Sequence, residues 1–157
     1  MRPYGVVVFA GTFDRLHEGH KHILRTALRL GERVRIGVTT DKMLSRKSRR
    51  AEIQTYEERE NGVMEFLRSE GATERCELFP IDTVEGGADV MSDIDALLVS
   101  DEPGVVQNAL RINEMRLKNG LKRFHVVIVP RVLTSDGRPL SSTRERLGDN
   151  TTGELIY

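Results

Sequence analysis

The stretch Phe9-Ala10-Gly11-Thr12-Phe13-Asp14-Arg15-Leu16-His17-Glu18-Gly19-His20 joins an apolar run directly to an amphipathic one. Residues 4–9, which lead into it, are typical of a buried strand. The residues after it predict a helix that ends near Gly31, with an apolar face made by Ile23, Leu24, Ala27 and Leu28. In a parallel α/β sheet, a turn from strand to helix lies at the carboxyl edge, where the helix amino terminus offers free N–H groups to an anion. The stretch therefore predicts a phosphate-binding turn.

The composition is that of one ordinary domain. The chain has 157 residues, 38% of them hydrophobic, which is enough to bury a core without metal or disulfide staples. Its 24 Lys and Arg residues balance 24 Asp and Glu residues, so no net field favours nucleic acid or an anionic membrane as a partner. The single cysteine, Cys76, fits a reducing compartment and is expected to pack within a strand. No apolar run has the length of a membrane span. We expect one domain over residues 1–157, soluble and cytoplasmic, as a monomer or small homo-oligomer.

The rest of the chain alternates strand and helix patterns. Strands are predicted at residues 33–40, 75–81, 94–100 and 124–130. The last of these is the most uniformly apolar, so we expect it to lie centrally in the sheet. Five strands that alternate with helices favour a Rossmann-like three-layer α/β/α sandwich with a five-stranded parallel sheet.

Two helix patterns carry their own start signals. Asp41 is suited to cap a short helix over residues 41–44, which would place Lys42 close to the end of a strand. Thr55 and Glu58 form a capping box ahead of a longer helix. The apolar face of that helix is predicted to contain Tyr56, Val63, Met64 and Leu67.

The chain also contains a third long helix pattern and two irregular segments. The helix begins near Pro103, whose missing N–H costs nothing in a first turn. Its predicted buried stripe is Val106, Ala109, Leu110 and Leu117. Residues 82–95 are expected to form a loop that can include one short helix, and we assign it no chemistry. Residues 45–50 (Ser-Arg-Lys-Ser-Arg-Arg) are either a solvated charged loop or a flap that closes over phosphates, and the sequence leaves both possibilities open.

His17 and His20 lie three positions apart at the mouth of a predicted helix. Both imidazoles can therefore project toward one ligand held over the helix amino terminus. A zinc site is the obvious alternative, but the zinc-protease pattern needs histidines four apart without an intervening glycine, and here Gly19 intervenes. The pattern favours an anionic ligand over a metal.

Two motifs at opposite ends of the chain resemble one enzyme superfamily. Gly11-Thr12-Phe13-Asp14 followed by His17-Glu18-Gly19-His20 resembles the signature of the HxGH nucleotidyltransferases. Leu140-Ser141-Ser142-Thr143 with Arg146 looks like their second motif. Within the superfamily, the chain is most similar to the archaeal and eukaryotic type of phosphopantetheine adenylyltransferase, through residues 11–24, 55–59, 109–114 and 136–139. The resemblance covers almost the whole chain.

This resemblance implies a reaction. The phosphate of 4′-phosphopantetheine attacks the α-phosphorus of ATP and gives dephospho-coenzyme A and pyrophosphate, without a covalent enzyme intermediate. The protein then has to align two anions and stabilise the charge on the α-phosphoryl group. Mg²⁺ is implied as a cofactor carried by the ATP phosphates, with no metal ligands from side chains.

The resemblance also implies roles for individual residues. His17, His20 and Lys42 are expected to be catalytic, and Thr12 and Lys42 to hold the phosphate of phosphopantetheine. Gly19 is expected to leave room for the nucleotide. The residues expected to bind ATP are Gly11, Phe13, Gly19, His20, Asp101, Glu102, Ser141, Ser142, Thr143 and Arg146.

The chain departs from the family pattern at a few positions. Glu145 stands where the second motif usually has an apolar residue before its arginine, and it completes a capping box with Ser142. The arginine-bearing motif that precedes the adenine site in the bacterial enzymes has no clear counterpart. The run Lys42-Met43-Leu44-Ser45 resembles the lysine loop of class I aminoacyl-tRNA synthetases, but it follows the histidines too soon for that class.

Two other functions stay open on the sequence. Another HxGH enzyme, of the glycerol-phosphate cytidylyltransferase or FAD synthetase type, would keep the chemistry and change the substrate. A noncatalytic nucleotide-binding or regulatory module would keep the site and lose the reaction.

Overall fold

The computed structural model describes residues 1–44, 52–142 and 153–157. Its elements follow one another as β1 (Tyr4–Gly11), α1 (Glu18–Leu30), β2 (Gly31–Thr39), α2 (Asp41–Leu44), α3 (Tyr56–Ser69), the 3-10 turn η2 (Thr73–Arg75), β3 (Cys76–Ile81), β4 (Ala96–Ser100), α4 (Pro103–Lys118) and β5 (His125–Val129). The described strands form one sheet in the order β3-β2-β1-β4-β5, and every neighbouring pair is parallel. The predicted Rossmann-like parallel sheet is confirmed.

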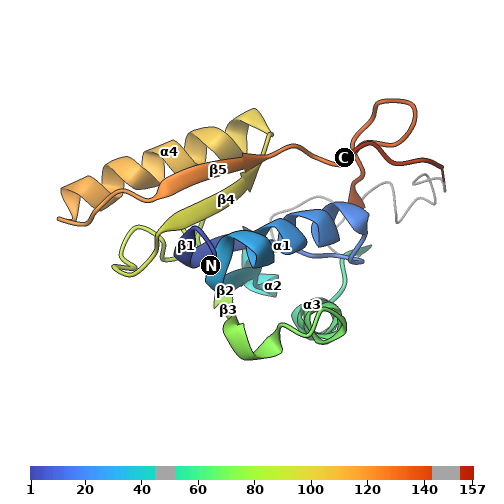
Figure 1. Ribbon diagram of the computed structural model, residues 1–157, viewed down its shortest axis with the longest axis horizontal. Coiled ribbons are helices and arrows are strands. Elements are labelled where there is room, and N and C mark those ends of the chain that lie inside the picture. Colours follow the sequence, from blue (N-terminus) through green and yellow to red (C-terminus); the bar gives the residue numbers. More distant parts are fainter. Residues whose placement is uncertain (45–51, 143–152) are drawn as a thin grey trace.

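Helices cover both faces of this sheet (Figure 1). On one face, α1 and α3 pack against β1, β2 and β4 through a core that includes Leu24, Ala27, Val63, Leu67, Val7, Ile36 and Leu98. On the other face, α4 and the segment before β4 pack over the sheet through Ala88, Ile94, Ala109, Ile112, Val8 and Leu97. Because all strands run in one direction, their carboxyl ends meet at one edge, where the turns after β1, β2 and β4 lie together.

The central strand is β1, and the prediction that residues 124–130 lie centrally is wrong. Val7 of β1 is fully buried, with β2 on one side and β4 on the other. By contrast β5 is an edge strand, with Ile128 51% exposed. The place of a strand in a parallel sheet follows from the direction of each crossover, so apolarity alone does not identify the centre.

The first helix has the predicted face, and all four predicted apolar residues are buried. It ends at Leu30, next to Gly31, as expected. Gly31 has an extended backbone and begins β2, and an added Cβ there would lie 2.8 Å from Cγ2 of Val7. Glycine therefore ends the helix by allowing a close approach to β1, without a left-handed turn.

Helix α3 begins at the predicted cap, Thr55, but only half of the predicted capping box forms, because the Glu58 carboxylate accepts from the Thr55 hydroxyl and not from its backbone N–H. The Thr55 hydroxyl accepts a hydrogen bond from the Glu58 N–H at 3.2 Å and donates one to the Glu58 carboxylate at 3.1 Å. Val63 and Leu67 are fully buried, while Tyr56 and Met64 are half-buried at the border of the core. The buried face contains two further residues, Phe66 and Arg59, that the predicted stripe did not include.

Two details of the other helices differ from prediction. In α2 the cap is Thr40, whose hydroxyl accepts from the Met43 N–H at 3.2 Å, and Asp41 is not the cap. In α4 the predicted stripe is wrong, because Leu110 is 53% exposed and Leu117 is 55% exposed. The buried face of α4 is made by Ala109, Ile112 and Arg116, with Val106 half-buried.

A buried arginine explains the orientation of α4. Arg116 is 0% exposed and donates to the carbonyls of Ala88 at 2.7 Å and Met91 at 2.6 Å. Burial lowers the pKa of its guanidinium. Turning Arg116 inward turns Leu110 and Leu117 outward, and it fixes the segment before β4 against the helix. Residues 82–95, all of them described, form turns and contain no helix.

Two further expectations from the sequence concern the cysteine and the membrane. Cys76 begins β3, where it is half-buried against the core, and burial raises the pKa of its thiol. Among the described residues, no helix combines the length and the apolarity needed to cross a bilayer.

Candidate active site

The turn after β1 is held in an unusual backbone conformation. Phe13 and Arg15 have φ values of +57° and +47°, a region that residues other than glycine rarely occupy. The Phe13 ring is 1% exposed, and it packs edge-on against Phe9 and beneath His20, with ring centroids 5.4 and 5.6 Å apart. Packing of this ring therefore holds the strained turn in place and supports His20.

His17 and His20 lie together in the first turn of α1. Their rings stack with centroids 3.8 Å apart and planes 20° from parallel. Nδ1 of His17 accepts a hydrogen bond from the Gly19 N–H at 3.0 Å, and Nδ1 of His20 accepts one from the His17 N–H at 3.1 Å. The two histidines thus form the reciprocal capping box of their own helix.

These hydrogen bonds determine which ring nitrogen carries the proton. A backbone N–H can only donate, so each Nδ1 is an acceptor and each neutral ring carries its proton on Nε2. Burial, and secondarily the nearby His17, lower the pKa of His20 to about 3. His20 is therefore a neutral imidazole at physiological pH, and its Nε2–H is a hydrogen-bond donor for an anion.

The structure gives a reason for glycine at position 19 that the sequence did not indicate. A Cβ added at Gly19 would lie 2.8 Å from Cε1 and 3.0 Å from Nδ1 of His17. Glycine is thus required for the imidazole of His17 to turn back and cap the helix. Gly19 also lines the cavity described below, so the predicted room for a nucleotide stays a prediction.

The motif near the end of the chain meets the turn after β1. Ser142 Oγ donates to the backbone carbonyl of Asp14 at 2.7 Å, across a separation of 128 residues. Asp14 itself is 1% exposed, and its carboxylate accepts the Gln54 N–H at 2.7 Å. The two ends of the chain therefore form one site. Thr143, Arg146 and the basic segment 45–50 lie outside the described residues.

A cavity of about 520 Å³ lies at this carboxyl edge, which is a size suited to small-molecule ligands. Eight of the predicted site residues line it: Gly11, Thr12, His17, Gly19, His20, Glu102, Ser141 and Ser142. Among the described residues, Phe13, Asp101 and Lys42 were also predicted for the site but are not part of the lining. Phe13 is 1% exposed, and its predicted part in binding ATP stays a prediction.

The lining of the cavity changes in character from one side to the other. Toward α4 and residues 82–95 it is mostly apolar, with Val84, Ala88, Val105, Ala109 and Ile112 beside Asn108 and Glu85. At the ends of β4 and β5 the polar and charged side chains Ser100, Glu102 and Arg131 stand beside apolar ones that include Val99, Val129 and Val132. Residues 82–95, to which the sequence assigned no chemistry, thus form one wall of the site.

Arg131 is a site residue that the sequence analysis missed. It follows β5, lines the cavity and donates from Nε to the Asp101 carboxylate at 2.7 Å. This hydrogen bond and the positive charge hold the pKa of Asp101 below its usual value. Asp101, predicted to contact the nucleotide, is thus engaged by Arg131. The available signal was a cation directly after the last strand, at the carboxyl edge of the sheet.

Lys42 is exposed on α2, which begins two residues after β2 ends. The end of β2 touches the turn after β1, because the Thr39 hydroxyl donates to the Thr12 hydroxyl at 3.1 Å. The lysine therefore lies at the predicted edge of the sheet, and its contact with phosphates stays a prediction. Within the described part of the chain, no group of three or more His, Cys, Asp or Glu side chains could hold a metal ion.

Comparisons with known proteins agree with this geometry. Residues 8–147 match the family described as cytidylyltransferase-like. A phosphopantetheine adenylyltransferase from Methanopyrus kandleri is 43% identical over 140 residues, which cover 89% of this chain and 87% of the relative. One from Thermococcus gammatolerans is 37% identical over 147 residues, covering 94% and 91% of the two chains.

A solved structure shows the same architecture. A protein of unknown function from Archaeoglobus fulgidus superposes with a TM-score of 0.68 at 31% identity, over 82% of this chain and 89% of that one. Fold, site and sequence therefore agree: the chain belongs to the cytidylyltransferase-like family and, within it, to the group of archaeal phosphopantetheine adenylyltransferases.

Proposed function

We propose that this protein transfers the adenylyl group of ATP to 4′-phosphopantetheine, a step in the biosynthesis of coenzyme A. An oxygen of the acceptor phosphate forms a bond to the α-phosphorus of ATP, and the bond from that phosphorus to the β-phosphate oxygen breaks. The products are dephospho-coenzyme A and pyrophosphate. The acceptor phosphate is already an anion near neutral pH, so the attack needs no general base.

One observation carries this proposal: donors from both ends of the chain converge on one cavity. The stacked histidines face it from the amino terminus of α1, and the Ser142 motif joins them through the carbonyl of Asp14. Imidazole N–H groups, hydroxyls and a helix amino terminus are the donors that a polyphosphate requires. In this proposal Mg²⁺ enters as part of the MgATP substrate, bound to the phosphate oxygens.

Each group has a distinct task in this proposal. The Nε2–H groups of His17 and His20 donate to the phosphoryl oxygens as negative charge develops on them. Ser141 and Ser142 hold the β- and γ-phosphates, which become pyrophosphate. Thr12 and Lys42 hold the acceptor phosphate in line with the α-phosphorus. Because the histidines are fixed by their own hydrogen bonds, they need no reorganisation at the moment of reaction.

The two sides of the cavity suggest how the substrates are divided. The polar and charged side chains among apolar ones at the ends of β4 and β5 suit the nucleotide, which has an apolar ring face as well as hydroxyls and ring nitrogens. The apolar side between α4 and residues 82–95 suits the long uncharged arm of the acceptor, and Asn108 offers it an amide partner. We propose this arrangement for the two substrates.

The experiment is a pyrophosphate-release assay with ATP or CTP against 4′-phosphopantetheine, glycerol 3-phosphate and FMN. We expect turnover with ATP and 4′-phosphopantetheine, and dephospho-coenzyme A identified by mass. Turnover of CTP with glycerol 3-phosphate, or of ATP with FMN, would instead assign another HxGH enzyme. Binding of ATP without turnover of any acceptor would assign a noncatalytic module.

A further inference from the structure

Arg59 is the most deeply buried charged side chain near the site. It lies in the first turns of α3, and its exposed fraction is 0%. Burying a guanidinium is costly unless its N–H groups find acceptors, and here they donate to three backbone carbonyls and one carboxylate. Nε donates to Gln54 O at 3.0 Å, and one terminal nitrogen donates to Thr39 O at 2.6 Å and Thr12 O at 3.0 Å.

The carbonyls that Arg59 holds belong to the ends of two neighbouring strands. Thr12 directly follows β1, and Thr39 is the last residue of β2. Their hydroxyls also bond to each other at 3.1 Å. The side chain thus fixes the spacing between the turn after β1 and the turn after β2 at the carboxyl edge.

The same guanidinium reaches α2. Its other terminal nitrogen donates to the Asp41 carboxylate at 3.0 Å. Asp41 is the first residue of α2, and the next residue is Lys42. One cation therefore connects Thr12, expected at the acceptor phosphate, with the short helix that carries Lys42.

Stability alone gives a weak reason for such an arrangement. An apolar side chain of similar volume usually fills a buried position as well as a charged one, because the charged one loses its hydration. What an apolar side chain cannot do is fix three chain segments relative to one another by directed hydrogen bonds. A lysine cannot do so either, since one ammonium lacks the planar fork that reaches opposite sides.

We infer that Arg59 is a positioning residue for adenylyl transfer: it sets Lys42 and Thr12 at the spacing that aligns the acceptor phosphate with ATP. This inference rests on the proposed function for its effect on turnover. It goes beyond that function in assigning the alignment to a side chain that does not line the cavity.

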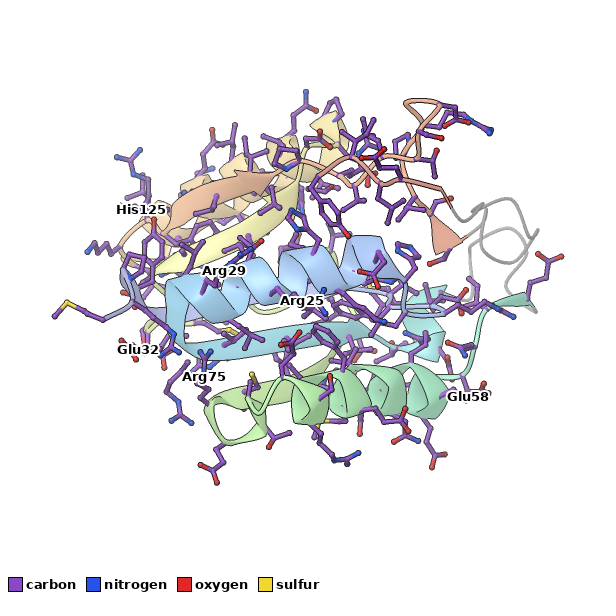
Figure 2. All side chains as sticks on the ribbon, turned by 45° about the vertical axis from the view of Figure 1, so that its right-hand side comes forward. Arg25, Arg29, Glu32, Glu58, Arg75 and His125 are labelled. Atoms are coloured by element: carbon purple, nitrogen blue, oxygen red, sulfur yellow. The ribbon has the colours of Figure 1, made fainter. Side chains whose placement is uncertain are left out.

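The test compares Arg59→Lys and Arg59→Met with the matched control Arg75→Met. Arg75 also donates to two backbone carbonyls, Leu28 O and Gly31 O at 2.8 and 2.7 Å. It lies at the opposite end of the molecule from Glu58 in the first turn of α3 (Figure 2). Arg75→Met therefore reports the loss of a carbonyl-binding arginine away from the site.

We expect Arg59→Lys to fold and to lower kcat by about 30- to 100-fold, since a displacement of about 1 Å costs about that much. The dissociation constant of ATP, measured separately, should change less than about threefold. Arg75→Met should keep the wild-type kcat. A folded Arg59→Lys variant with wild-type kcat would overturn the inference, and if Arg59→Met does not fold, the lysine variant still decides.

Two more readouts separate positioning from general stability. If Arg59 acts through Lys42, adding Arg59→Lys to Lys42→Met should slow turnover little beyond Lys42→Met alone, and fully additive losses would contradict this.

Hydrogen exchange of the amides at residues 40–44 should rise at least about tenfold in Arg59→Lys and stay unchanged in Arg75→Met. The exchange measurement needs no substrate. If the wild type turns over no acceptor, the proposed function fails, while unchanged exchange at residues 40–44 would overturn the placement of α2 by Arg59.

Discussion

At the scale of single residues, the geometry of the turn after β1 depends on close contacts between side chains that leave little room for substitution. The imidazole of His17 bends back over Gly19, and the ring of His20 stacks on it. The strained backbone at Phe13 is held by a buried ring. The residue types of this turn are predictable from the sequence, because each suits a strand-to-helix turn that binds an anion. The stacking of His17 on His20 and their mutual capping are not predictable from the sequence, because they depend on side-chain torsions.

Gly19→Ala tests this packing. The new Cβ would come within 2.8 Å of the His17 ring, which must then move and lose its hydrogen bond to the helix. We expect a loss of helix-cap stability of about 1 kcal/mol and a fall in kcat of at least about tenfold. The control is Gly62→Ala in α3, where nothing lies within 4 Å of an added Cβ. That change should stabilise the protein slightly and leave kcat alone. Equal kcat values for the two variants would disprove the role given to Gly19.

The pKa of His20 predicts a difference in acid stability. In the unfolded chain His20 titrates near 6.5, and in the folded protein near 3, so the unfolded state binds more protons between these values. The neutral ring therefore contributes stability that is complete above pH 6.5 and is lost as the pH falls toward 3. In His20→Gln this contribution is absent. We expect the wild-type advantage in the free energy of unfolding, measured with urea, to shrink between pH 7.5 and 4.5. Parallel curves for the two proteins would show that His20 is not held neutral.

At the scale of elements, local signals succeeded where a helix or strand could be recognised by its own ends. The His17 region predicted α1, and Thr55 with Glu58 predicted α3. Local signals failed where a contact with a residue far away in the chain decides which face of a helix is buried. Arg116 rotates α4 by binding the carbonyls of Ala88 and Met91, and no periodicity shows that an arginine faces inward. Residues 82–95 were not recognised as a wall of the site, because their position depends on the same distant contacts with Arg116.

The short helix α2 contains Lys42, whose predicted role in the reaction can be tested by substitution. Lys42→Met keeps most of the apolar stem and removes the charge, so the melting temperature should change little while the chemical step slows sharply. Lys42→Arg should rescue poorly, because a planar guanidinium does not replace a compact charge between two phosphates. Single-turnover kinetics and thermal melts of the three proteins check this. A Lys42→Met variant that folds and turns over near the wild-type rate would make this lysine a surface residue.

Leu133 links the segment before Ser141 to residues near the end of the chain, because it forms β-bridges with both Pro139 and Ile156. Leu133 and Ile156 exchange two backbone hydrogen bonds, both 2.9 Å long. Ile156→Pro removes one donor, whereas Ile156→Val keeps it. We expect the proline variant to raise the KM for ATP about fivefold, the equivalent of a hydrogen bond worth about 1 kcal/mol. The valine variant should match the wild type. If both variants have the wild-type KM, the bridge does not support the Ser141 segment.

At the scale of the whole molecule, the parallel sheet brings the two motifs together. The sequence predicts five strands with their turns at one edge, which places His17 there. Ser142 follows the last strand only after a long irregular segment, so its place beside this turn was implied by the family resemblance and not by the edge rule. The sequence does not predict the order β3-β2-β1-β4-β5, because apolarity does not tell an edge strand from a central one. Nor does it reveal the buried arginines Arg59 and Arg116, several of whose acceptors are carbonyls far away in the chain.

The most direct test of the site is single-turnover formation of dephospho-coenzyme A by the wild type, His20→Ala and His125→Ala. His125 is an exposed histidine at the start of β5, bonded to the Tyr4 hydroxyl at 2.9 Å and distant from α3's first turn (Figure 2). We expect His20→Ala to slow the chemical step at least about 100-fold, since one preorganised donor contributes roughly 3 kcal/mol to transition-state stabilisation. The dissociation constant of ATP should change far less, and His125→Ala should match the wild type. A His20→Ala variant that binds ATP weakly but reacts at the wild-type rate would contradict a role for this histidine in adenylyl transfer.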